Sequence, residues 1–295
     1  MTAAIAHVGP NLPQDLLRAT GRHSGPLRFE TQRQTPTAER WMESKFAPWA
    51  RAILEGWAAG EYDGIGQVIF SRADDSAQRL YYYLCELQRR GLVGGPEPLI
   101  LDIAKVPRAS SVARTEYSLR QLAGRLGVNE AALAGAIEAC NAERTRQEPT
   151  SAGRRCLLAG TPPPDRRLHD AAAHAGFTAV GSTLVDTWTQ LGAVVDVAGG
   201  DPIAALAHQV HSDPAGPRSF ADPGAALHRA IAESGAEAVV LWQIEEDEAQ
   251  AWHLPAQSAA LADEGLPALV MTRRDWLARD GAADEIVSFL QGIGQ

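Results

Sequence analysis

Two groups of acidic residues occupy matching places in the chain. Asp74 and Asp75 form the first group, and Glu245, Glu246 and Asp247 form the second. Each group closely follows a short apolar segment and precedes a run in which apolar residues have helical spacing. Carboxylates in such places could bind a hard cation such as Mg²⁺, or act as acid and base. The acids are therefore the first candidates for a functional site.

The segments around the acids repeat in the same order. Residues 66–103 have the pattern of a strand, acids, a helix, a turn with glycine and proline, and a second strand, and residues 238–271 have it again. In parallel α/β sheets, ligand crevices open beyond the carboxyl ends of the strands, where the acids and Arg72 would lie. The alternative is that each acid caps a helix N-terminus and complements the helix dipole. For any single acid we favour the cap, although the repetition favours a site.

Strands and helices alternate along the whole chain, which favours parallel sheets covered on both faces. The length of 295 residues suits two such domains. Residues 147–153 have the composition of a linker. We therefore predict an α/β protein with two Rossmann-like, doubly wound domains, residues 1–150 and 151–295, with helical N-terminal and central segments.

The elements predicted outside the two repeats are mostly short. We expect residues 1–36 to be rich in loops, with one helix at 13–19. Further helices are predicted at 37–47, 49–57, 112–126, 130–146, 165–175 and 203–210, further strands at 156–159, 178–180 and 194–197, and a surface loop at 212–223.

Composition and charge exclude several classes of protein. The net charge of −9 argues against nucleic acid as the main partner, because phosphate binding needs a basic stripe. Apolar runs stay shorter than the roughly 18–20 residues that cross a membrane, and the first residues lack the pattern of a signal peptide. Cys85, Cys140 and Cys156 are too scattered for a disulfide framework or a CxxC metal site. We therefore expect a cytoplasmic protein in a reducing compartment.

Other candidate motifs are weaker. His208 and His211 are three residues apart with Asp213 nearby and could share a metal ion, but no third histidine or cysteine is close in sequence, so a polar helix end is the better account. The glycines of 64–66 precede their strand instead of following it, which argues against a dinucleotide loop. Three prolines within 160–164 remove backbone donors that a phosphate would need.

Several stretches, in the same order, resemble one family. Residues 38–48 are similar to a family segment that ends in a Cys-Pro pair, and 74–81 to its Cys-Asp stretch. Residues 137–144 resemble the Asn-x-x-Arg ending of the family's central helix. Two further stretches, 201–207 and 265–270, also match. The family is that of the 2-hydroxyacyl-CoA dehydratase and benzoyl-CoA reductase subunits, and the resemblance covers residues 10–295.

The resemblance implies a fold, a partner and a cofactor. Family members have two Rossmann-like domains, pair two related subunits, and hold a [4Fe-4S] cluster with cysteines near bound acyl-CoA; an ATP-hydrolysing activator delivers the electron. In this chain the cysteine positions carry Ala47, Asp74 and, within the second acidic group, Glu246. Iron–sulfur clusters need thiolate ligands, which alanine and carboxylates do not replace. The resemblance therefore implies the fold and the pairing, without a cluster or other metal in this chain.

Three hypotheses for function follow. The leading one is a cluster-less subunit that pairs with an iron–sulfur-bearing paralogue and helps to enclose the acyl-CoA cavity. The second is a stand-alone binder of acyl-CoA or another small molecule, or a non-redox enzyme, with Arg72, Asp75, Glu245 and Asp247 as the polar groups of its cleft. The third is a structural subunit of a larger redox assembly. No residue is assigned a catalytic role.

Overall fold

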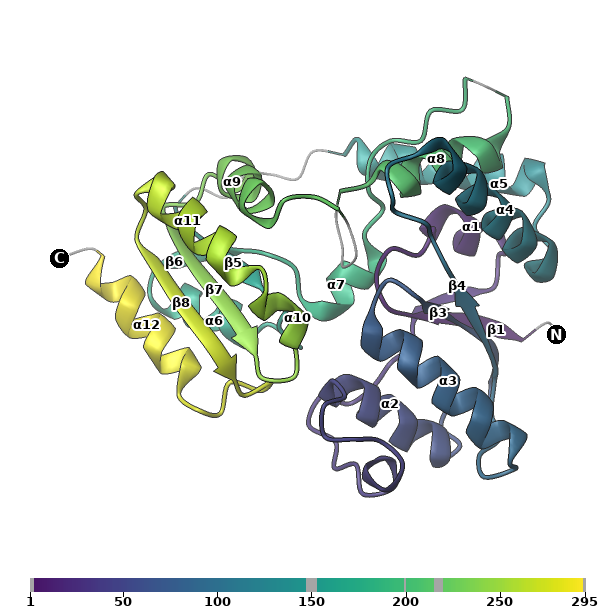
Figure 1. Cartoon of the computed structure of the whole chain (residues 1–295), viewed down its shortest axis with the longest axis horizontal. Coiled ribbons are helices and arrows are strands. Elements are labelled where there is room, and N and C mark those ends of the chain that lie inside the picture. Colours follow the sequence, from purple (N-terminus) through teal and green to yellow (C-terminus); the bar gives the residue numbers. More distant parts are fainter. Residues whose placement is uncertain (1–2, 147–152, 199, 215–219, 294–295) are drawn as a thin grey trace. The chain divides into compact units, whose positions relative to one another are not determined.

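Among the described residues, strands of four to seven residues form two sheets, each of four parallel strands (Figure 1). The strand order is β2-β1-β3-β4 in one sheet and β6-β5-β7-β8 in the other. The strands are β1 (Ala4–Val8), β2 (His23–Pro26), β3 (Ile65–Ser71), β4 (Glu97–Leu101), β5 (Arg154–Gly160), β6 (Phe177–Val180), β7 (Ala238–Ile244) and β8 (Ala268–Arg274). The computed structural model describes residues 3–146, 153–198, 200–214 and 220–293. The predicted α/β class with two Rossmann-like sheets is confirmed.

The helices connect the strands and cover the sheets. They are α1 (Gln14–Ala19), α2 (Pro48–Ala58), α3 (Asp75–Arg89), α4 (Ala109–Leu126), α5 (Glu130–Arg144), α6 (Arg167–His174), α7 (Leu184–Thr189), α8 (Pro202–Ser212), α9 (Pro223–Ser234), α10 (Glu248–Ala251), α11 (Leu254–Glu264) and α12 (Ala282–Gly292). The carboxylates of Asp201 and Asp222 cap α8 and α9, each of which has proline at its first position. Proline is favoured there because that N–H has no partner within the helix.

The chain divides into two units, each with its own sheet. Unit 1 comprises residues 1–44, 49–148 and 187–220, and unit 2 comprises 45–48, 149–186 and 221–295. In unit 1, α2 and α3 lie on one face of the sheet, and α1, α4, α5 and α8 lie on the other (Figure 1). In unit 2, α9 and α11 cover one face, and α6 packs against α12.

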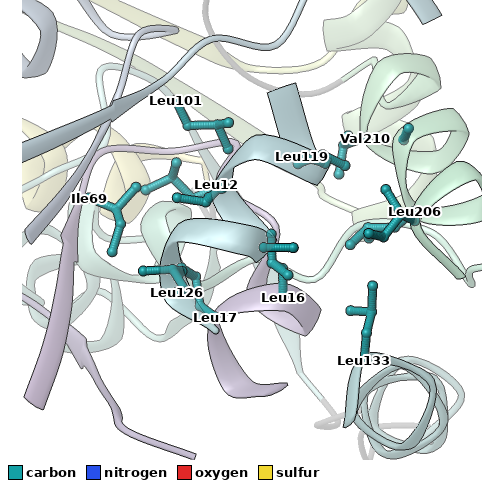
Figure 2. Packing of buried hydrophobic residues seen from close by; sticks show 14 of the residues in the cluster. Leu12, Leu16, Leu17, Ile69, Leu101, Leu119, Leu126, Leu133, Leu206 and Val210 are labelled. Carbon is teal, nitrogen blue, oxygen red and sulfur yellow. The ribbon is translucent and has the colours of Figure 1, made fainter. Parts of the chain in front are cut away.

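The core of unit 1 joins the sheet to four helices. Ile69 of β3 lies in one cluster with Leu16 of α1, Leu119 of α4, Leu133 of α5 and Leu206 of α8, as Figure 2 shows. All five side chains are fully buried. Burial of a leucine side chain stabilises a fold by about 1.5–3 kcal/mol, so α8 is an integral part of this core.

Residues 187–214, here called the return segment, belong to unit 1 although they follow strands of unit 2 in the sequence. The apolar face of α8 packs against α4 and α5. The predicted division of the chain at residue 150 assigns this segment to the C-terminal domain, whereas the structure groups it with unit 1. Most of the predicted linker, residues 147–152, lies outside the described residues.

Three local predictions are wrong. Residues 1–36 contain two strands, β1 and β2, because the four residues from Ile5 to Val8 are all buried in a parallel pairing with β3. Residues 37–47 form only a short 3₁₀ turn, Ala38–Arg40, instead of a helix. No strand forms at 194–197: Val195 alone is buried, and its backbone bonds to a side chain of α5.

Candidate functional site

Both sheets have a topological switch point, where strands are added on opposite sides of the first strand. The switch lies between β1 and β3 in unit 1 and between β5 and β7 in unit 2. Loops that leave the carboxyl ends of two such strands diverge, and ligand crevices of open α/β sheets lie between them. Arg72 and the first acids follow β3, and the second acids follow β7. The sequence therefore located the acids at the expected edge.

A tightly packed glycine ends the first strand of each sheet. Gly9, which follows β1, and Gly160, at the end of β5, both have φ = +96°. A Cβ on Gly9 would lie 2.8 Å from the Cβ of Ser71, and a Cβ on Gly160 would overlap the carbonyl oxygen of Trp242. Glycine is required because other residues rarely adopt this φ and because the neighbouring strand leaves no space. The first strand of each unit therefore ends in the same way, at a glycine with positive φ that packs against the neighbouring strand.

The acids of unit 1 have structural roles. Asp74 is the N-cap of α3, and its Oδ1 accepts a hydrogen bond of 2.7 Å from the backbone N–H of Ala77. Asp75 is the exposed first residue of the helix, where a negative charge complements the dipole. The guanidinium of Arg72 forms an ion pair with Asp102, which follows β4. The helix-cap alternative therefore describes Asp74 better than a ligand site.

The acids of unit 2 differ from one another. Glu245 is exposed and lies 3.8 Å from the guanidinium of Arg273. Glu246 and Asp247 are partly buried. The carboxylate of Asp247 accepts a hydrogen bond of 2.9 Å from the hydroxyl of Thr161, the residue after β5. Burial raises the pKa of the Asp247 carboxyl, although the hydroxyl of Thr161 acts in the opposite direction.

Thr161 joins the two loops of this switch point. Its backbone N–H donates to the carbonyl oxygen of Trp242 at 2.8 Å, and its Oγ1 accepts a bond of 3.4 Å from the N–H of Ile244. With its bond to Asp247, the residue therefore connects the end of β5 with the end of β7. A carboxyl that holds its proton more readily than usual, beside a hydroxyl at a switch point, is suited to proton transfer. Thr161 was not among the predicted site residues, although its position directly after a strand was a usable signal.

The three former cysteine positions are distributed over both units. Ala47 belongs to unit 2 and directly precedes α2, and its methyl side chain carries no atom that could bind a metal. Glu246 also belongs to unit 2, whereas Asp74 belongs to unit 1. Lys45 forms an exposed ion pair of 3.1 Å with Glu248, at the start of α10. A site shared by the acids of the two units stays a prediction.

Two histidines that were not predicted as site residues, the buried His7 and the partly buried His23, lie at the first sheet. His7 of β1 has its Nδ1 2.8 Å from Nε2 of His23 and its own Nε2 3.1 Å from the carbonyl oxygen of Trp188. A carbonyl can only accept, so His7 carries hydrogen on Nε2 and accepts from His23 at Nδ1. Burial lowers the pKa of His7 to about 3 and that of His23 to about 4. Both rings are therefore neutral near pH 7.

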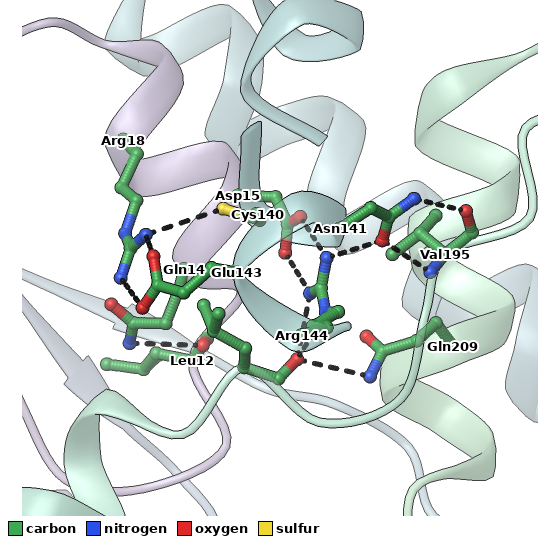
Figure 3. A network of polar contacts seen from close by, with 11 residues as sticks. Leu12, Gln14, Asp15, Arg18, Cys140, Asn141, Glu143, Arg144, Val195 and Gln209 are labelled. Atoms are coloured by element: carbon green, nitrogen blue, oxygen red, sulfur yellow. Dashed lines mark hydrogen bonds and ion pairs between the residues drawn. The ribbon is translucent and has the colours of Figure 1, made fainter. Parts of the chain in front are cut away.

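A buried polar network holds the return segment in unit 1 (Figure 3). Arg144 forms a two-bond ion pair with Asp15, at 2.7 and 2.8 Å, and both side chains are only 2% exposed. Arg144 also donates to the carbonyl oxygen of Leu191 at 2.8 Å. The amide of Asn141 forms two bonds of 2.9 Å with the backbone of Val195. The Asn-x-x-Arg pattern therefore acts as a clamp between α5, α1 and the return segment.

The remaining histidines and the cysteines offer little metal chemistry. His211 bonds through Nδ1 to the carbonyl oxygen of Ala104 at 2.6 Å, and His208 is exposed, as expected of a polar helix end. Burial raises the pKa of the Cys140 thiol to about 11 and that of Cys156 to about 12. In the part of the chain that the structure describes, no three His, Cys, Asp or Glu side chains are grouped so that they could hold a metal ion.

Comparisons with known proteins add no assignment. No protein-family model matches the chain, and no curated protein matches it either. Among the described residues, no helix combines the length and the apolar character needed to cross a membrane.

Proposed function

We propose that the chain is a cluster-less subunit of an assembly like the 2-hydroxyacyl-CoA dehydratases and benzoyl-CoA reductases. It would pair with an iron–sulfur-bearing paralogue and help to enclose the acyl-CoA cavity. The two parallel sheets with the same strand order agree with the two Rossmann-like domains that the resemblance implies. The observation that carries the proposal is the use of Asp74, whose carboxylate caps α3 at a position where the family has a cluster cysteine.

The chain's donor atoms do not fit an iron–sulfur cluster. Ala47 has no ligand atom, and carboxylates at 74 and 246 are hard donors, whereas clusters are held by soft thiolates. Cys140 and Cys156 are buried, and their raised pKa values keep them protonated near neutral pH. Cys85, the remaining cysteine, lies in α3, eleven residues after Asp74. We therefore assign no electron-transfer step to this chain.

A subunit without a cluster still has a physical use in such an assembly. Exclusion of water protects a reactive intermediate and strengthens the electrostatic interactions around it. A second Rossmann-like subunit can supply that enclosure without redox chemistry of its own. An obligate pairing of this kind would bury more than about 2,000 Å² of surface.

The pairing is tested by purification of the tagged chain from its native host, followed by size-exclusion chromatography with mass detection. We expect one species that contains a cluster-bearing paralogue. A stable monomer that binds no paralogue would refute the subunit proposal.

The loss of the cluster is tested by anaerobic reconstitution with iron and sulfide. We expect no absorbance near about 400 nm from the natural chain, and a gain of that absorbance in the triple variant Ala47→Cys, Asp74→Cys, Glu246→Cys. The matched control introduces cysteines at Ala58, Asp75 and Glu248 instead and should gain no such absorbance. A four-iron cluster in the natural chain would overturn the proposal.

A second candidate, a stand-alone binder or non-redox enzyme, is favoured by one observation. Asp247 and Thr161 form a hydrogen-bonded pair at the switch point of unit 2, and the pKa of the carboxyl is raised. In that case Asp247→Asn would abolish activity toward an acyl-CoA while the protein remains a folded monomer. An unchanged rate in that variant would exclude Asp247 as the proton carrier.

A further inference from the structure

A pocket opens in unit 1 between α8 and residues 193–196 of the return segment, and its volume is about 460 Å³. That volume is within the range of sites for small molecules. None of the acids that follow the strands contributes to its wall. The side chains that decide its chemistry are Val194, Asp196, His208, Gln209 and Asp213.

The walls of this pocket are held in place before any ligand arrives. Bonds from Arg144 to Leu191 and from Asn141 to Val195 fix the return segment on both sides of residues 192–194. The N-terminus of α8 is capped by Asp201, and its C-terminal carbonyl groups are bound by Lys105, whose Nζ donates to the oxygen of Val210 at 2.6 Å. A preformed site loses less entropy on binding.

One polar side chain in the wall is poorly satisfied. Gln209 is only 8% exposed, yet its Nε2 makes just a long bond of 3.4 Å to the carbonyl oxygen of Leu191, which already accepts from Arg144 at 2.8 Å. Within the described ranges, no donor reaches its Oε1, which is shielded from solvent. A buried acceptor without a donor is unfavourable. Because a single long bond holds the amide, it can turn its oxygen toward a donor in the pocket.

The charges around the pocket are acidic. Asp196 and Asp213 carry carboxylates, and no lysine or arginine is among the described residues that line it. Lys105 donates to the backbone oxygens of Val210 and Asp213, and its positive charge also offsets the carboxylate of Asp213. Asp196 therefore leaves the pocket with a net negative charge. Val194, which is 53% exposed, adds an apolar surface. A ligand that fits would donate hydrogen bonds, carry positive charge and have a hydrocarbon part.

We propose that this pocket binds a small organic ammonium ion. Its N–H groups would donate to Oε1 of Gln209 and face the carboxylates of Asp196 and Asp213, with its alkyl chain against Val194. The imidazole of His208 would border the site. The proposal does not depend on a partner subunit, so it can fail or succeed independently of the proposed pairing.

The test is isothermal titration of the full-length chain with n-pentylamine, and with pentanoate as a probe of equal length and opposite charge. We expect n-pentylamine to bind with a Kd of about 1 mM or tighter, and pentanoate to show no binding below about 10 mM. Equal affinity for the two probes, or no binding of the amine below about 10 mM, would overturn the proposal.

Substitutions locate the binding. Gln209→Met keeps the size of the side chain but removes its acceptor, and we expect the Kd of the amine to rise at least about tenfold. Asp196→Asn, on an exposed residue, should weaken binding several-fold even if the first variant fails to fold. Asp263→Asn, on the exposed surface of α11, is the matched control and should leave the Kd unchanged. An unchanged Kd in both pocket variants would overturn the assignment.

Discussion

Unit 1 and unit 2 place an acid after equivalent strands, but the two carboxylates are used differently. Asp74 follows β3 and caps α3, a helix of 15 residues, through the N–H of Ala77. Asp247 follows β7 and precedes α10, which has only four residues, and its carboxylate bonds to the hydroxyl of Thr161. A long helix has unpaired N–H groups that bind a carboxylate directly. Where the helix is short, the side chain instead pairs across the switch point.

The comparison shows that topology fixes where an acid lies but not what it does. In both units the acid is at the carboxyl edge, beside a tightly packed glycine. The element that follows decides whether the carboxylate is a cap or a group with a raised pKa. The switch point of unit 2 is therefore the better place to look for proton chemistry.

We expect the largest effect from Gly160→Ala. The new Cβ would overlap the carbonyl oxygen of Trp242 and would also strain a φ of +96°, so the loss in free energy of unfolding should exceed about 4 kcal/mol. Gly9→Ala, which meets side-chain atoms instead of a backbone oxygen, should cost less. Urea unfolding followed by tryptophan fluorescence measures both.

The control for the glycine variants is Gly176→Ala. Gly176 also has a positive φ, but nothing lies within 4 Å of a Cβ built there. Its substitution should cost about 1 kcal/mol, from backbone strain alone. Equal costs for the variants at Gly160 and Gly176 would contradict the close approach of the two strands.

The second largest effect should come from the clamp of unit 1. Arg144→Met leaves the Asp15 carboxylate buried without its partner, and we expect a loss of about 3 kcal/mol in the free energy of unfolding. In the double variant Asp15→Leu, Arg144→Met, no charge remains unpaired, so most of the loss should be recovered. Unfolding by denaturant measures the free energy of unfolding of the single and the double variant. A double variant that is less stable than Arg144→Met would show that the bonds to Leu191 matter more than the ion pair.

The units should respond to acid with opposite signs. Since the pKa of His7 is lowered to about 3 and that of His23 to about 4, the folded protein binds fewer protons than the unfolded chain below the ordinary value of 6.5. Their contribution to stability is complete above about pH 6.5 and is lost as the pH falls toward 4, by on the order of 3 kcal/mol. The raised pKa of Asp247 acts the other way, because the folded state then binds its proton more readily than the unfolded chain.

The measurement is the free energy of unfolding between about pH 7.5 and pH 4.5. His23→Gln should flatten the loss between pH 6.5 and 4.5, whereas Asp247→Asn should remove the small gain at the acid end. The exposed pair of His228 and Glu264 provides the control variant, His228→Gln. A pH profile of His23→Gln identical to that of the natural chain would contradict the pairing of His23 with the buried ring of His7.

The smallest effects should come from the acids themselves. Asp74→Ala removes a helix cap and should cost about 1 kcal/mol, whereas Asp74→Asn keeps an acceptor and should cost only a few tenths. Asp247→Asn removes a partly buried charge but keeps an acceptor for Thr161, so it should be neutral or slightly stabilising. Thermal unfolding of the three variants measures these differences in stability. A cost for Asp247→Asn equal to that for Asp74→Ala would erase the distinction between the two acids.

The elements of the fold that could be predicted are those marked by a pattern of neighbouring residues. β3 and β7 are apolar runs, each followed by residues with helical spacing. In both repeats, a turn with glycine and proline separates the helix from the next strand. These features also located the acids at the carboxyl edge. β1 was missed because it is only five residues long and contains His7, which is buried through its pairing with His23 and the carbonyl of Trp188.

Contacts between distant residues were not predictable. The helix of the return segment was expected, but the apolar face of a helix does not specify which sheet it covers. Its place depends on bonds from Asn141 and Arg144 to Val195 and Leu191, about 50 residues later in the chain. The sequence showed the Asn-x-x-Arg pattern, but it did not indicate which residues the two side chains bind. For the same reason, the pairing of Thr161 with Asp247 needed the structure.

The interrupted course of unit 1 has a consequence for synthesis on the ribosome. Leu119 and Leu133 are made long before Leu206, the residue of α8 that packs in the same core, and β5, α6 and β6 of unit 2 emerge in between. At about 5–20 residues per second, the parts of the apolar faces of α4 and α5 that α8 covers stay exposed for several seconds. During that interval the nascent chain offers a hydrophobic surface to chaperones, and a chain that ends before α8 would keep it exposed.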